Sequence, residues 1–166
     1  MNDNSGQHTQ HSSDEGTSQK QMRKVQLFRA RALQFGVFET EIATIAEWHE
    51  PTPLPHAPES VLGVVSIQGR MLTVLDLTFL AGESLPADNF FLYIVALRGD
   101  EQLALAVNKL DELIEYSSLG SEKATQNNER FVLKVLTVAG EDVRLLNVTE
   151  LFPAALQGRE RRRRRF

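Results

Sequence analysis

Few side chains in this sequence have a type and spacing that could carry chemistry. There is no cysteine, which excludes disulfides, thiolate catalysis and cysteine-ligated metal sites. His8 and His11 lie in a polar tail, where a pair of histidines is more often solvated than metal-bound. His49 and His56 have no acidic or sulfur residue at metal-ligand spacing. No Ser-His-Asp set, paired-carboxylate motif or glycine-rich phosphate loop is present. We therefore expect no enzymatic activity, no metal site, no cofactor and no small-molecule substrate.

Asp76 is the one acidic residue in a tightly patterned stretch. Two apolar runs precede it, at residues 62–67 and 71–75, and Gln68-Gly69-Arg70 separates them. This pattern predicts two buried strands joined by a tight reversal. Apolar residues continue over 77–80, so we expect Asp76 to cap a short helix there. Its replacement by alanine should lower stability without removing any turnover.

The rest of the chain reads mostly as β-structure. Further strands are expected at residues 25–31, 33–38, 42–48, 90–97, 102–107, 131–139 and 143–148. Loops are expected at 82–89 and 117–130, a turn at 140–142, and an extended proline-rich connector at 51–58. About nine or ten strands with such spacing are typical of barrels and sandwiches.

Helical segments are expected to be short. Residues 39–44 predict a helical turn with acidic residues near its start. Residues 109–116 fit either a helical turn or a strand at 113–116. A closing helix is expected over 150–156, with Thr149 as its cap and Pro153 limiting its length.

Charge is distributed unevenly along the chain. The net charge is -4, and residues 1–24 sum to zero. Residues 159–166 hold six Arg and one Glu, or +5, which leaves -9 for residues 25–158. An acidic body repels phosphates, so a nucleic-acid interface would depend on the tail alone.

The two ends differ from the middle in composition. Residues 1–24 are too polar to bury a core and are expected to be disordered, followed by a folded domain over 25–156. Residues 157–166 form an arginine-rich tail, which repels itself and is not expected to fold alone. It could contact nucleic acid, anionic lipid, or an acidic partner or body. Without a signal peptide or a membrane-spanning run, a cytoplasmic protein is expected.

Two segments of the chain are similar to each other. Residues 72–80 and 143–151 each have a strand pattern, then Asp or Asn, then an aliphatic residue and a short helical pattern. This internal similarity favours two related half-units packed together over one large barrel.

The order of these pieces resembles the CheW family, the coupling proteins of bacterial chemotaxis-type signalling. The resemblance rests on Phe35-Gly36-Val37, on the prolines of 53–58, on the block 62–69, on Leu72-Thr73-Val74-Leu75-Asp76-Leu77 and on residues 145–151. It covers about residues 25–156, and the order and spacing of the motifs carry it.

The resemblance implies a mostly β fold of two intertwined five-stranded β-barrel subdomains with short helices around a shared core. It also implies a non-catalytic adaptor of a two-component system, which couples the cytoplasmic tip of a chemoreceptor to a CheA-type histidine kinase. The receptor-binding positions would be Ile42, Thr44 and Gln68. The kinase-binding positions would be Leu62 and Gly63.

Residue types alone leave alternatives open. Ile42 and Leu62 would serve equally well in a core, and Gly63 in a β-bulge. The chain also departs from the family pattern, with Gln68 for Arg, Ser66 for Asn, Thr73 for Pro and Asn108 for Asp. The alternative function is a β-barrel scaffold that binds nucleic acid or an anionic membrane through residues 159–166. That alternative predicts binding that falls steeply with salt.

Overall fold

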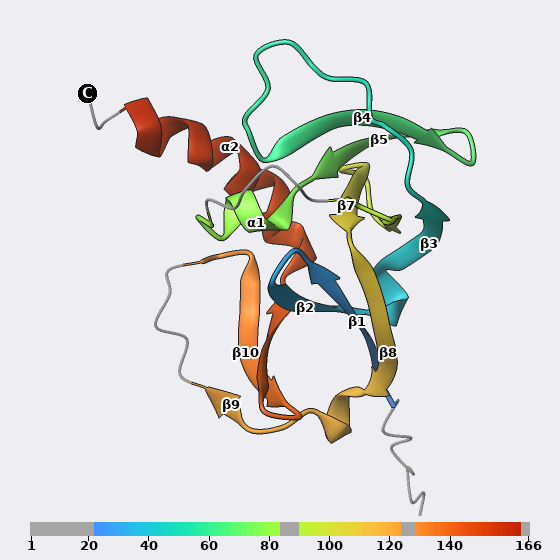
Figure 1. The fold of residues 1–166 in the computed structure, drawn as a ribbon, viewed down its shortest axis with the longest axis vertical. Helices are drawn as coiled ribbons and strands as arrows, with labels where there is room; N and C mark the ends of the chain where they lie inside the picture. The colour runs from blue at the N-terminus through green and yellow to red at the C-terminus, as the bar shows by residue number, and fades with distance from the viewer. Residues whose placement is uncertain (1–21, 84–89, 124–128, 164–166) are drawn as a thin grey trace, which may run out of the picture.

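The computed structural model describes residues 22–83, 90–123 and 129–163, and beyond Gln157 only the backbone of the last helix. Figure 1 shows the fold. Its strands are β1 (Lys24–Ala30), β2 (Leu33–Phe38), β3 (Ile42–Glu47), β4 (Val61–Ile67), β5 (Arg70–Leu75), β6 (Tyr93–Leu97), β7 (Leu103–Val107), β8 (Lys109–Glu115), β9 (Glu122–Lys123), β10 (Val132–Val138) and β11 (Glu141–Leu146). Its helices are η1 (Glu39–Glu41), α1 (Leu77–Leu80), η2 (Tyr116–Ser118), η3 (Val148–Glu150) and α2 (Leu151–Arg163).

The strands form two sheets, and the strands of one sheet are inserted in sequence between strands of the other. The first sheet has six strands in the order β8-β1-β2-β11-β10-β9, and the second has five in the order β3-β6-β7-β5-β4. The whole second sheet is therefore inserted between β2 and β8. The predicted pair of intertwined β subdomains is confirmed, with the two-residue β9 as an extra strand in the first.

The two sheets repeat one topology, as the internal similarity of the sequence predicted. In the first sheet β2 pairs with β11 in parallel, and in the second β7 pairs with β5 in parallel. Each of these four strands also belongs to an antiparallel hairpin, namely β1–β2, β10–β11, β6–β7 and β4–β5. The similar segments fall on β5 with α1 and on β11 with η3, so each half ends its central hairpin in a helix.

Three apolar clusters explain why several strands are apolar on both faces. One cluster fills the inside of the second sheet. Another cluster fills the inside of the first sheet. The third and largest lies between the sheets and takes residues from both, including Phe28, Phe35, Leu75, Leu105 and Leu146. β7, with five buried residues, is covered on both faces because it separates two clusters.

Local expectations for the hairpins hold with small shifts. Gln68 and Gly69 form the two-residue turn between β4 and β5, both with positive φ (51° and 77°), which suits the twist of a tight hairpin. The turn predicted at 140–142 lies one residue earlier, at Ala139 and Gly140. Residues 109–115, left open between helix and strand, form β8 because they pair with β1.

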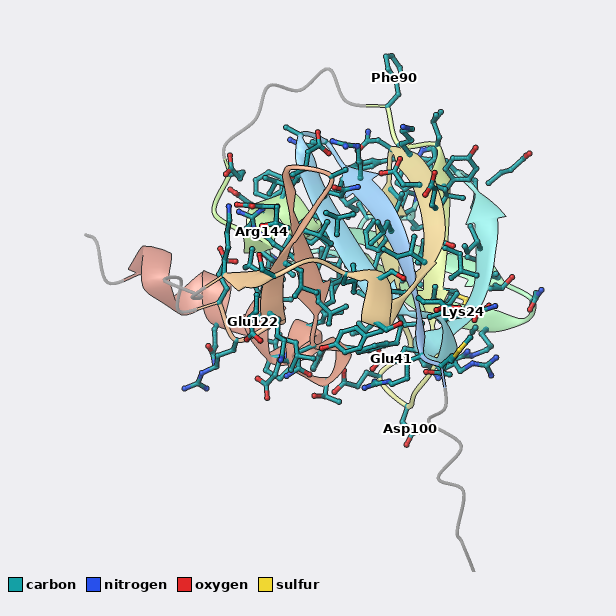
Figure 2. The ribbon with its side chains drawn as sticks, turned by 90° about the horizontal axis from the view of Figure 1, so that it is seen from below. Lys24, Glu41, Phe90, Asp100, Glu122 and Arg144 are labelled. Atoms are coloured by element: carbon teal, nitrogen blue, oxygen red, sulfur yellow. The ribbon has the colours of Figure 1, made fainter. Side chains whose placement is uncertain are left out.

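The strand predicted over 90–97 is shorter than expected. β6 begins at Tyr93, although the carbonyl of Leu92 still accepts a hydrogen bond from the Trp48 amide at 2.9 Å. Phe90 is 83% exposed and extends away from the body in Figure 2. The loop expected at 82–89 falls mostly outside the described residues, as do most of residues 1–24. The loop predicted over 117–130 is wrong in part, because residues 116–118 form η2 and residues 122–123 form β9 by pairing with β10, while residues 124–128 lie outside the described part.

The closing helix corrects two predictions. Asn147, not Thr149, is at the start of η3, and α2 runs on from Leu151 through the arginine run to Arg163. Pro153 does not limit it, because it lies in the first helical turn, where its missing N–H has no intrahelical partner to lose. No helix in the described ranges is long and apolar enough to span a membrane.

Candidate functional site

The predicted receptor-binding residues Ile42 and Thr44 lie on β3, the edge strand of the second sheet. Ile42 is half-buried against the central cluster and opposite Leu97. A bulge separates it from Thr44, which is half-buried and opposite Ala96. Ile42 therefore packs against the core with one part of its side chain and leaves the rest at the surface, so its receptor-binding role stays a prediction.

Gln68 lies at the same end of the second sheet as Ile42. It is exposed in the β4–β5 turn, beside Arg70, whose Nη2 donates a hydrogen bond to the carbonyl of Gly99 at 3.3 Å. The preceding Arg98 donates from Nε to the carbonyl of Ile42 at 3.0 Å. The loop between β6 and β7 thus contacts both β3 and β5. The strand register does not bring all three predicted receptor-binding residues together, because Thr44 lies level with Gly63 across the sheet.

Leu62 and Gly63 lie at the opposite end of β4. Leu62 and Gln68 are six positions apart along β4 and its turn, which is about 20 Å. Gly63 is buried in a bulge with φ of 145°, under the backbone of Thr52, whose amide and carbonyl pair with Val64 at 2.9 Å. Its own chain therefore covers Gly63. Leu62 is half-buried and reaches the surface beside it.

Sequence reasoning missed an ion pair between the two subdomains. Arg31, in the turn between β1 and β2, donates from Nη2 to Asp76 Oδ2 at 3.0 Å, with the side chains 11% and 0% exposed. Asp76 also caps α1 as predicted, accepting from the amide of Thr78 at 3.0 Å. One buried carboxylate thus joins the first subdomain to the helix of the second.

Asn108 completes this contact. Its Oδ1 accepts from the Arg31 amide at 2.5 Å, and its Nδ2 donates to the carbonyl of Phe90 at 2.6 Å. The Arg31 guanidinium also lies 5.6 Å from the Phe79 ring and 5.9 Å from the Phe91 ring. We call Arg31, Asp76 and Asn108 the interlock. An arginine in a hairpin turn was its only signal in the sequence.

Glu41 is the last residue of η1 and directly precedes Ile42, one of the receptor-binding candidates. Burial raises the pKa of its carboxyl, while the backbone hydrogen bond at Phe38 and the positive charge of Arg23 oppose that rise. The Arg23 guanidinium stacks 3.6 Å from the Phe38 ring. Glu41 Oε2 is buried and accepts no hydrogen bond within the described residues. An ionised Glu41 is therefore a source of instability at this surface.

Glu41→Gln is expected to raise the free energy of unfolding near neutral pH. Because the folded pKa lies above the ordinary value of 4.5, the ionised carboxylate destabilises the fold at high pH, and the penalty disappears as the pH falls below 4.5. Urea unfolding at about pH 7 and about pH 3 measures this. The matched control is Glu39→Gln, at an exposed neighbour. An equal gain at both pH values would contradict the burial account.

A comparison with protein families decides the identity of this fold. The model of the CheW-like domain matches residues 24–156. The chain belongs to the CheW-like family. It is 26% identical over 137 residues to the chemotaxis protein CheW of Rhizobium meliloti (strain 1021), covering 80% of this chain and 88% of that one.

A solved structure agrees with the CheW-like fold. The crystal structure of the scaffolding protein TtCheW from Thermoanaerobacter tengcongensis superimposes with a TM-score of 0.64 at 18% identity. The match covers 76% of this chain and 89% of that one. In the described part of this CheW-like chain, no three His, Asp or Glu side chains gather as a metal site would require. The candidate residues are instead surface positions on two β-sheets.

Proposed function

We propose that this CheW-like chain is a non-catalytic adaptor that couples a chemoreceptor tip to a CheA-type histidine kinase. One observation carries the proposal: Gln68 and Leu62 lie about 20 Å apart along β4, and the other receptor-binding candidates, Ile42 and Thr44, lie on β3 at the opposite edge of the second sheet. Two partners can therefore bind at the same time without competing for space. The family membership supplies the classes of partner.

The mechanism is transmission of position through a stiff element. β5 lies between β4 and β7, and one face of the strand pair β4–β5 is covered by the apolar cluster of the second subdomain. The central cluster covers the other face at Leu75, while Ser66 and Met71 near the turn are exposed. A well-packed sheet resists deformation, so a shift of the receptor at one end moves the kinase-binding end as a unit. No proton, metal or nucleophile is needed for this function.

Gln68 is expected to weaken the receptor contact. The resemblance places an arginine here, and a glutamine amide cannot supply a fixed positive charge. Gln68→Arg should therefore tighten binding to a receptor cytoplasmic fragment by about fivefold, without a change in stability, because the side chain is exposed. Isothermal titration measures this, with Gln68→Met as the uncharged control. Equal affinity for both variants would remove this residue from the interface.

The decisive experiment is a pull-down with the full-length chain. The baits are a CheA regulatory domain and a receptor cytoplasmic fragment, offered separately and together. We expect both to bind, Leu62→Glu to lose only the kinase, and Thr44→Arg to lose only the receptor. The control is Leu133→Glu, at an exposed position of β10 in the other subdomain. Loss of both partners from either variant would show unfolding, and no binding by the native chain would refute the adaptor function.

A further inference from the structure

Two arginine side chains are fixed beside the start of β3, where the receptor-binding candidate Ile42 lies. Arg98 donates from Nε to the carbonyl of Ile42 at 3.0 Å, and its backbone amide donates to the carbonyl of Glu41 at 2.8 Å. Arg70, the first residue of β5, donates from Nη2 to the carbonyl of Gly99 at 3.3 Å. Each guanidinium is therefore attached to the backbone by one hydrogen bond, and both lie at the loop between β6 and β7.

Neither guanidinium has a carboxylate partner within the described residues. The ion pairs found there involve Arg29, Arg31, Arg144 and three lysines, but not Arg70 or Arg98. This holds although residues 25–158 carry a net charge of -9. Arg98 is exposed and Arg70 is half-buried. The two Nη atoms of Arg98, and Nε and Nη1 of Arg70, are thus left as donors for an acceptor from outside the chain.

A cavity of about 290 Å³ lies beside Arg98. Residues 97–103 form one wall, and Val148 and Thr149 of η3 form the other. The cavity therefore lies between the β6–β7 loop of the second subdomain and a helix of the first. A space of this size admits a side chain of a partner protein, and a guanidinium in its wall favours a carboxylate, to which it can donate two parallel hydrogen bonds.

Acidic residues of the same loop restrict the partner further. Asp100 and Glu101 are exposed next to Arg98, and Asp100 extends away from the body in Figure 2. Glu41 adds a third carboxyl nearby, although its own hydrogen bond goes to the backbone at Phe38. These charges repel a partner surface that is acidic throughout. The site therefore fits a single carboxylate whose neighbours are uncharged or basic.

We propose that Arg98, assisted by Arg70, binds an acidic side chain of the receptor tip and so determines which receptors this chain accepts. The proposal rests on the adaptor function proposed above. The hydrogen bond to Ile42 holds the Arg98 side chain before the receptor arrives, so less side-chain entropy is lost on binding. A carboxylate bound to Arg98 also lies beside Ile42, which fixes the charged contact and the apolar contact relative to each other.

The test is isothermal titration of the full-length chain with a receptor cytoplasmic fragment at low and high salt. At low salt Arg98→Gln should weaken binding by about tenfold and Arg70→Gln by about threefold. The affinity of the native chain should fall as salt rises, whereas that of the double variant should barely change. Arg98→Lys keeps the charge but not the planar donor group, so it should retain the salt dependence at a lower affinity.

The matched control is Arg130→Gln, which removes the same charge from an exposed position before β10 and should leave the affinity unchanged. Asp100→Asn should tighten binding by about twofold, because it removes a repelling charge. Thermal unfolding of each variant checks its fold. A loss for Arg98→Gln that is equal at both salt concentrations would mean that Arg98 only holds β3, and would overturn the proposal.

The native chain separates this proposal from the adaptor function. A native chain that binds the receptor fragment as tightly as the double variant does would overturn the role of the two arginines alone. A native chain that binds no receptor fragment at either salt concentration would refute the receptor half of the adaptor function as well.

Discussion

Asp76→Ala is expected to lower the free energy of unfolding by about 3–5 kcal/mol, because it removes the carboxylate from a nearly buried guanidinium. The substitution also removes the cap of α1, because Asp76 Oδ1 accepts a hydrogen bond from the Thr78 amide at 3.0 Å. Asp76→Asn keeps a capping oxygen but not the charge, so its loss should be smaller. Urea unfolding followed by circular dichroism measures all three proteins.

A double-mutant cycle with Arg31→Leu shows whether the effect comes from the ion pair. A coupling energy of about 1–3 kcal/mol is expected, because the two side chains meet inside the protein. Asp142→Ala is the control, since its ion pair with Lys123 is exposed and should contribute under about 1 kcal/mol. An Asp76→Ala loss no greater than that of the control would mean that the interlock does not join the subdomains.

Gly63→Ala is expected to destabilise the chain by at least about 2 kcal/mol, because φ of 145° is strained for any residue with a side chain. A Cβ at this position would also lie 2.3 Å from the carbonyl oxygen of Thr52. The added methyl group must therefore push the Pro51–Thr52 segment off β4. Thermal unfolding and urea unfolding measure the loss.

Gly69→Ala is the matched control, because φ there is also positive, at 77°, but no atom lies within 4 Å of the added Cβ. Only the conformational cost of about 1 kcal/mol is expected. Equal losses at both glycines would mean that the Thr52 contact is not rigid. This comparison also decides where kinase binding should be tested. Any side chain placed at Gly63 would disturb β4 itself, so a loss of kinase binding is easier to interpret for a variant of Leu62.

Features that depend on neighbours in the chain followed from the sequence. Gln68-Gly69 specified its hairpin turn, because few residues tolerate positive φ. Asp76 specified the start of α1, because a carboxylate two residues before an amide can cap it. The likeness between 72–80 and 143–151 predicted two half-units. Each of these signals lies within about ten residues of its effect.

The sequence by itself therefore predicted most of the strands, the turns and the family, although it missed β9 and the start of β6. Only the tertiary structure decided that residues 109–115 form a strand, because both periodicities fit until β1 paired with them. It alone joined Arg31 to Asp76 and closed Thr52 over Gly63, since partners far apart in sequence leave no periodic trace. For the same reason, only the folded chain shows that Ile42 and Thr44 lie on the edge strand farthest from β4 in the sheet order, with Thr44 level with Gly63.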